Sequence, residues 1–110
     1  MSIKIFCLEK GKAPAVQHAF EVQIGRDESI SALKKLIKAE KPVAFAHVDA
    51  DNLRLWMVNI SADQDELLQQ HPTRNSTELL PIKKVSYYFS GDNEPLDEYI
   101  HVIVEVPTGN

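Results

Sequence analysis

The sequence of 110 residues contains one cysteine, no long apolar run and no excess of positive charge. Cys7 has no second cysteine with which to form an internal disulfide, and no Cys and His residues have zinc-site spacing. No apolar stretch approaches the roughly 20 residues that span a bilayer, so we expect no membrane span. Residues 1–8 run directly into Glu9 and Lys10, which is unlike a signal peptide. Secretion of this chain would therefore use a leader that has been removed, an unconventional route, or no leader.

The charge balance is acidic, with 12 Lys and Arg residues against 16 Asp and Glu residues and a net charge of −4. Nucleic-acid-binding domains generally carry a basic stripe that displaces counterions from phosphates. We therefore expect this domain not to bind nucleic acid. The hydrophobic fraction of 44% is ordinary for a globular protein, and the length fits a single domain over residues 1–110.

Two strands are predicted near the N-terminus, over residues 3–8 and about 17–24, because apolar and polar side chains alternate there. The turn chemistry of Gly11 and Pro14 between them predicts a hairpin. The side chains expected to face the core are Ile3, Ile5, Cys7, Phe20, Val22 and Ile24.

A helix is predicted from the N-cap residue Ser29 to about Glu40, where Pro42 stops it. The apolar stripe of this helix consists of Ile30, Leu33, Leu36 and Ile37. The remaining helix surface carries Lys34, Lys35, Lys38 and Lys41. These lysines could meet anionic lipid or nucleic acid, but a charge run on a helix is more often a solvated face.

Two further strands are predicted, over residues 53–60 and 99–106, separated by an irregular stretch. Leu53, Leu55 and Met57 should share the core face of the first. In the stretch between them we expect a capping box at residues 61–64, a short helix with Leu67 and Leu68, and a strand plus helical turn within residues 79–89. The order hairpin, helix, strand, irregular stretch, strand predicts an α+β fold of the ubiquitin-like β-grasp type, a mixed sheet with one main helix packed across one face.

The first 41 residues resemble the opening of ubiquitin in their strand, turn, strand and Ser-capped helix. The chain ends Pro107-Thr108-Gly109-Asn110, without the two glycines that are activated for conjugation. We therefore expect no role as a protein modifier.

A more specific resemblance covers nearly the whole chain. Residues 5–8, the helix segment LKKLIKAEKP at 33–42, the loop VDADNL at 48–53 and residues 78–81 resemble the Crinkler effector N-terminal domain. The place of that family's LxLFLAK translocation motif is taken by Leu53, Leu55, Trp56, Met57, Val58 and Asn59, with departures at the last four positions that suit a fungal-type member. Near the end of the chain, the sequence resembles the family's closing motif, HVLVVVP, at His101, Val102, Ile103, Val104, Val106 and Pro107.

The resemblance implies a non-enzymatic module at the head of a secreted effector, mediating secretion and translocation into host cells. It implies a separate C-terminal effector domain, absent from this chain, and localisation to the host cell, with the host nucleus as a destination of the full-length protein. It implies no cofactor.

A contact surface is predicted on the sheet face turned away from the helix. If the last strand lies between the first and third, Phe6, Ile103 and Trp56 could lie side by side, flanked by Val58 and His101. An exposed cluster of this kind marks a site for protein partners or self-association. The alternative is that residues 61–98 fold over the cluster and bury it. A general ubiquitin-like interaction or self-association domain is accordingly the second functional hypothesis.

Catalytic and metal-binding residues are not indicated. The four histidines, His18, His47, His71 and His101, have no nucleophile paired with them in the local sequence. Asp49 and Asp51 lack the further oxygen ligands that calcium needs, and Cys7 falls on the inward side of a strand.

Overall fold

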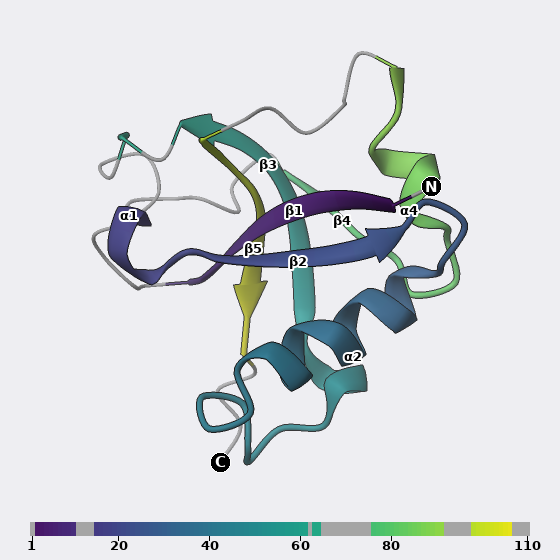
Figure 1. Ribbon diagram of the computed structural model, residues 1–110. Helices are drawn as coiled ribbons and strands as arrows, with labels where there is room; N and C mark the ends of the chain where they lie inside the picture. Colours follow the sequence, from purple (N-terminus) through teal and green to yellow (C-terminus); the bar gives the residue numbers. More distant parts are fainter. Residues whose placement is uncertain (1, 11–14, 62, 65–75, 92–97, 107–110) are drawn as a thin grey trace.

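The computed structural model describes residues 2–10, 15–61, 63–64, 76–91 and 98–106, in which one mixed sheet packs against one main helix (Figure 1). The elements are β1 (Ser2–Glu9), α1 (Ala15–His18), β2 (Phe20–Gly25), α2 (Ile30–Glu40), the 3-10 turn η1 (Ala50–Asn52), β3 (Arg54–Ser61), β4 (Thr77–Glu78), α4 (Val85–Tyr88) and β5 (Tyr99–Glu105). The predicted α+β, ubiquitin-like arrangement is confirmed.

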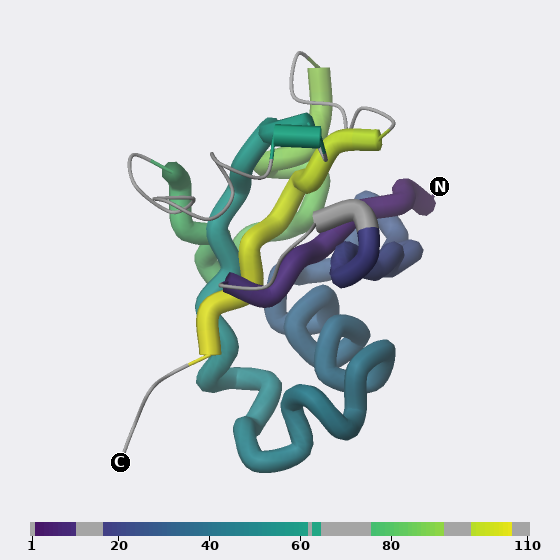
Figure 2. Tube along the Cα trace, turned by 90° about the vertical axis from the view of Figure 1, so that its left-hand side faces the viewer, coloured from purple at the N-terminus to yellow at the C-terminus, as the bar shows by residue number. Residues whose placement is uncertain are grey.

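The five strands are ordered β2-β1-β5-β3-β4. β1 pairs with β2 in antiparallel and with β5 in parallel orientation, whereas β3 is antiparallel to both β5 and β4. The last strand therefore lies between the first and third, as predicted. Figure 2 shows α2 on one side of these strands, so the sheet has one face covered by the helix and one turned away from it, here called the outer face.

The predicted cap begins α2, because the Ser29 hydroxyl accepts a hydrogen bond from the Ala32 N–H at 3.1 Å. Beneath the helix lies the main core, a buried cluster to which the helix and all four predicted strands contribute. It includes Ile3, Ile5, Cys7, Phe20, Val22, Ile24, Ile30, Leu33, Ile37, Leu53, Leu55, Val102 and Val104.

The prediction was wrong for two residues of α2. Leu36, assigned to the apolar stripe, is 40% exposed, whereas Lys34, assigned to the solvated surface, is 5% exposed. The two residues lie about 200° apart around the helix axis, on opposite flanks of the buried stripe. The apolar stem of Lys34 is therefore covered. The hydrogen bond from Arg54 is the main cause that lowers the pKa of Glu78 on β4, and the charge of Lys34 adds a smaller effect.

Two local differences separate structure from prediction. Residues 15–18 form the helical turn α1 where the start of a strand was expected. A short strand was expected within residues 79–89, but the strand of this segment is β4, which lies just before residue 79. The helical turn expected in the same segment is α4. The expected helix at Leu67 and Leu68 lies outside the described residues. No helix in the described part has the length and apolarity to cross a membrane.

Candidate contact surface on the outer face

A second buried cluster lies on the outer face of the sheet. Leu8, Val58, Ile100 and Ile103 form its centre, and Phe6, Ala19, Trp56 and Ile60 pack against it. The alternation of β3 explains the division, because Leu55 belongs to the main core while its neighbour Trp56 belongs to this second cluster. β5 contributes to both, so it is buried on its two faces.

The predicted row of three side chains is partly confirmed. Trp56 pairs with Ile103 across β3 and β5, but the β1 residue opposite Ile103 is Leu8. Phe6 lies two residues away, beside His101, with ring centroids 6.2 Å apart. The parallel register, in which the Lys10 N–H donates to the Val104 carbonyl at 2.8 Å, sets this offset.

Exposure and burial of this face were both left open by the sequence, and three of its five residues are buried. Val58, His101 and Ile103 are 8%, 3% and 0% exposed. Phe6 and Trp56 are half-buried and are the two that reach the surface. The accessible part of the predicted contact face is therefore confined to its two aromatic members.

His101 has a structural contact at this position. Its Nδ1 accepts a hydrogen bond from the Phe6 N–H at 2.9 Å, so this nitrogen carries no proton. The imidazole thereby bridges β1 and β5 where a backbone carbonyl would ordinarily accept.

Trp56 is held in place by charged neighbours. Its indole Nε1–H donates to Glu105 Oε1 at 2.9 Å, and the Arg54 guanidinium lies 4.9 Å from its ring centroid. Arg54 also donates two hydrogen bonds to the Glu78 carboxylate, at 3.0 and 3.1 Å. Lys10 Nζ lies 3.3 Å from the other oxygen of Glu105. These five residues, Lys10, Arg54, Trp56, Glu78 and Glu105, are called the Trp56 rim below.

The electrostatics of the rim keep its carboxylates ionised. The hydrogen bond from Arg54 lowers the pKa of Glu78. Partial burial acts to raise the pKa of Glu105, but the hydrogen bonds from Trp56 and Lys10 outweigh it and the net pKa is lowered. The rim thus presents one aromatic edge between fixed charges of both signs, a combination typical of protein contact sites.

The translocation-motif-like residues have contrasting environments. Leu53 and Leu55 are fully buried in the main core, and Val58 belongs to the second cluster. Met57 is half-buried against the main core, and Asn59 is exposed. Most residues of this motif therefore pack inside the domain.

The closing-motif residues are similarly structural. Val102 and Val104 lie in the main core and Ile103 in the second cluster, while Val106 packs against the main core. Pro107 lies outside the described residues.

Sequence reasoning missed Leu8 and the charged members of the rim. Glu105 follows Ile103 by two residues and Arg54 precedes Trp56 by two, so alternation alone could have assigned both to the outer face. The pairing of Arg54 with Glu78 depends on β4, whose two residues carry too short a pattern to reveal a strand.

Cys7 is a free cysteine buried in the main core. Burial raises the pKa of the Cys7 thiol, and its Sγ lies 3.9 Å from the Ile5 carbonyl oxygen. His71 lies outside the described residues. Within the described ranges, no three His, Cys, Asp or Glu residues lie where they could hold a metal ion.

The chain is similar to proteins of one family. The family model described as Crinkler effector protein N-terminal domain matches residues 3–105. Crinkler effector protein 1 of Rhizophagus irregularis is 49% identical over 107 residues, which cover 97% of this chain and 22% of that protein. Crinkler effector protein 8 of Phytophthora infestans is 29% identical over an alignment covering 97% of this chain and 20% of that protein. The chain thus spans about a fifth of the length of these relatives.

One solved structure shares the fold across nearly the whole chain. It is the putative Ras interaction domain of AFD-1 from Caenorhabditis elegans, with a TM-score of 0.59 over 96% of this chain and 95% of that domain. The sequence identity is 8%, so the likeness concerns the fold alone.

Proposed function

The chain belongs to the Crinkler effector N-terminal domain family, and we propose that it is a non-catalytic module that carries a longer secreted effector into host cells through a protein contact at the Trp56 rim. The observation that supports the contact most directly is the half-buried Trp56, fixed by Glu105 and Arg54 on a rigid sheet. An aromatic side chain already held in one orientation loses little conformational entropy when a partner binds.

The burial of Leu53 and Leu55 favours recognition at the rim, which includes the motif residue Trp56, over recognition of the motif as a continuous segment. A receptor cannot reach Leu53 or Leu55 while the domain is folded, because both are fully buried. Substituting them tests whether delivery needs a folded domain. Substituting an exposed rim residue tests whether delivery needs a surface.

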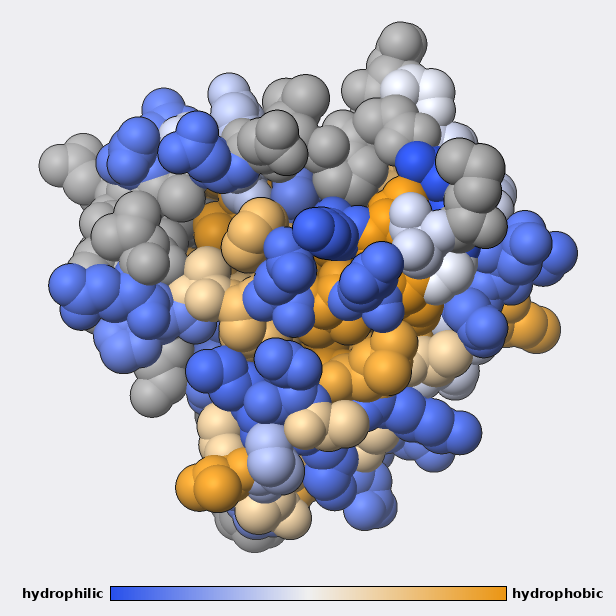
Figure 3. Space-filling model, in the orientation of Figure 1, coloured by the Kyte–Doolittle hydropathy of each residue, from blue (hydrophilic) through white to orange (hydrophobic). Residues whose placement is uncertain are grey.

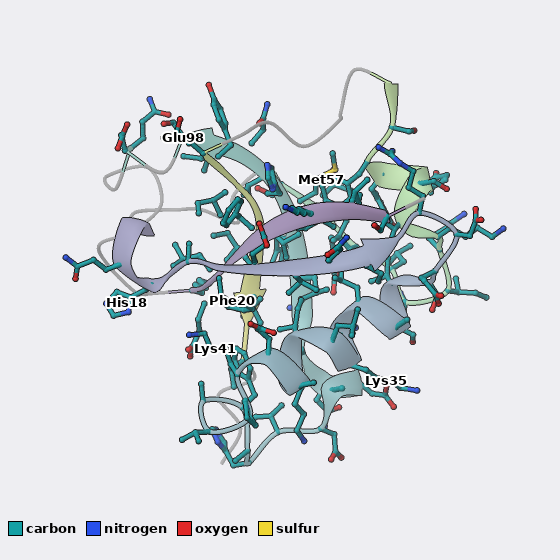
Figure 4. All side chains as sticks on the ribbon, in the orientation of Figure 1. His18, Phe20, Lys35, Lys41, Met57 and Glu98 are labelled. Atoms are coloured by element: carbon teal, nitrogen blue, oxygen red, sulfur yellow. The ribbon has the colours of Figure 1, made fainter. Side chains whose placement is uncertain are left out.

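The direct experiment fuses residues 1–110 to one half of a split reporter and applies the fusion to host cells that express the other half in the cytosol. Lys10→Glu reverses a rim charge beside Glu105, and Lys35→Glu makes the same change on α2, which lies across the opposite face of the sheet (Figure 4). Both lysines are exposed, and an exposed ion pair contributes only about 0–1 kcal/mol, so both variants should fold.

We expect reporter signal from the unsubstituted fusion and from Lys35→Glu, and a clear loss with Lys10→Glu. If the unsubstituted fusion stays outside host cells, the delivery role is wrong. If it enters and Lys10→Glu enters equally well, delivery stands and the rim is not the contact surface.

A further inference from the structure

β2 forms a free edge of the sheet, next to β1 on one side and without a neighbouring strand among the described residues on the other. The backbone direction along this edge follows from contacts already described. The N–H groups of Phe6 and Lys10 donate to β5 residues, so the even-numbered residues of β1 turn their backbone groups toward β5. Residues of β1 at odd positions must therefore supply the bonds to β2.

The β2 residues that are opposite even-numbered β1 residues turn their backbone groups away from β1, toward the open edge. Glu21 is opposite Phe6 and Gln23 is opposite Lys4 in the antiparallel register. Their N–H and C=O groups consequently face outward. The described residues supply no backbone hydrogen bond to either of them on that side.

Most of the usual protections of an edge strand are missing from β2. Natural edges are blunted by proline, by a bulge, by charged side chains or by extreme shortness. Of these, β2 has one charged side chain, Glu21. β2 pairs with β1 over six consecutive positions without a register shift and contains no proline, and its inward side chains, Phe20, Val22 and Ile24, are apolar. The opposite edge, β4, has only two residues. An open edge of this length is suited to pairing with another strand.

We propose that β2 pairs with β2 of a second copy of this chain in antiparallel orientation, joining the two sheets about a two-fold axis at Val22. Outward-facing residues must oppose each other, which places Glu21 of each copy against Gln23 of the other. The same register places Phe20 against Ile24 and Val22 against its own copy, so apolar side chains meet apolar side chains. The neighbouring alternative, centred on Glu21, would oppose two carboxylates and is disfavoured.

The ends of β2 are complementary in charge. At its start, Lys41 Nζ lies 5.5 Å from the Phe20 ring centroid, and His18 lies beside them at the same end of the strand (Figure 4). Just after its end come Arg26, whose guanidinium donates to the Phe89 carbonyl, and the exposed Asp27 and Glu28, so this turn has a net charge of −1. Antiparallel pairing brings the start of one copy to the end of the other, so that the acidic turn faces Lys41.

The start of β2 also has open space beside Lys41. A pocket of about 180 Å³ opens there. Its lining residues are Glu9, His18, Phe20, Lys41, Ala44 and Phe45.

The helix beside the edge supplies apolar area. Leu36 is 40% exposed on α2, and α2 packs against β2. Figure 3 shows apolar surface between hydrophilic side chains on the side of the molecule that carries β2 and α2. The two-fold axis would bring two copies of α2 to the same face of the joined sheet.

The pairing should be weak, because one six-residue strand and one helix flank give an interface below the roughly 1,200 Å² of stable complexes. Sedimentation velocity should therefore follow the chain at concentrations on the order of 0.01–1 mM. We expect a reversible monomer–dimer equilibrium within this range.

The proposed register makes a charge-swap prediction. Gln23→Glu would oppose two carboxylate pairs and should weaken the dimer about fivefold to thirtyfold. Adding Glu21→Lys to this variant would place an ammonium group opposite the introduced carboxylate in both pairs and should restore the dimer. Gln64→Glu, the same chemical change at an exposed residue beyond β3, should leave the dimer unchanged.

Thermal melts at low concentration verify that each monomer is folded. A chain that stays monomeric at about 1 mM overturns the proposal. A dimer that Gln23→Glu does not weaken overturns the β2 edge as its interface. A dimer that Gln23→Glu weakens and Glu21→Lys does not restore overturns the register. The Trp56 rim is not part of this interface, so these outcomes are independent of the delivery experiment.

Discussion

Replacing Leu55 by alanine tests the packing of the main core, because this side chain is fully buried beneath α2. The substitution removes three carbons, and at about 0.8 kcal/mol for each the lost transfer free energy is about 2.4 kcal/mol. The cavity left behind adds up to about 2.5 kcal/mol, so we expect a loss of about 2–5 kcal/mol in unfolding free energy. Urea unfolding followed by the fluorescence of Trp56, the single tryptophan, and by circular dichroism measures the loss.

The matched control is Leu36→Ala, the same chemical change on the exposed flank of α2. Alanine is a good helix former and little apolar area is lost there, so we expect a cost below about 1 kcal/mol. Equal costs for the two variants, or a cost below about 1 kcal/mol at Leu55, would refute the assignment of Leu55 to the main core.

Two further predictions concern the rim carboxylates and the cap of α2. The pKa values of Glu78 and Glu105 are lowered from 4.5. A carboxyl with a lowered folded-state pKa stabilises the fold above its unfolded-state pKa. This stabilisation is lost as the pH falls through the folded-state pKa. Glu105→Gln should therefore lower stability at neutral pH and flatten its decline below about pH 4.5, as measured by urea unfolding; an unchanged pH profile would contradict the rim contacts. Ser29→Ala removes the acceptor for the Ala32 N–H and should cost about 0.5–2 kcal/mol, whereas a neutral effect in thermal and urea melts would mean that this cap does not stabilise the helix.

Local patterns in the sequence were sufficient to predict the strand faces and the helix. Alternation assigns Leu55 and Trp56 to opposite sides of β3, and Ser29 with Pro42 brackets α2. These features depend on neighbours along the chain, so sequence alone carries them. The strand order was also predicted, because the last strand of a β-grasp sheet lies between the first and third strands.

Features that depend on distant residues were not predictable. The neighbour of Ile103 on β1 is Leu8, a parallel register that no local pattern specifies. A register shift between Met57 and Ile60 bends the β3–β5 pairing, which alternation cannot reveal. Lys34 is buried in the folded domain, although its position on the helix alone indicated solvent.

The difference between local and distant contacts also explains why only part of the candidate site was predicted. Trp56 was identified by its type and its strand face. The burial of His101 and Val58 was not, because a residue on the far side of a sheet is exposed or covered according to segments that join it only in three dimensions.

The position of β5 has a consequence for how the domain is made and taken apart. The strand that bridges β1 and β3 is the last one in the described chain, so a chain emerging from the ribosome holds two unjoined sheet halves until residue 105 is available. A machine that pulls from this end would withdraw the central strand first, taking Val102 and Val104 from the main core and Ile100 and Ile103 from the second cluster. Passage through a narrow pore would then begin with the separation of β1 from β3.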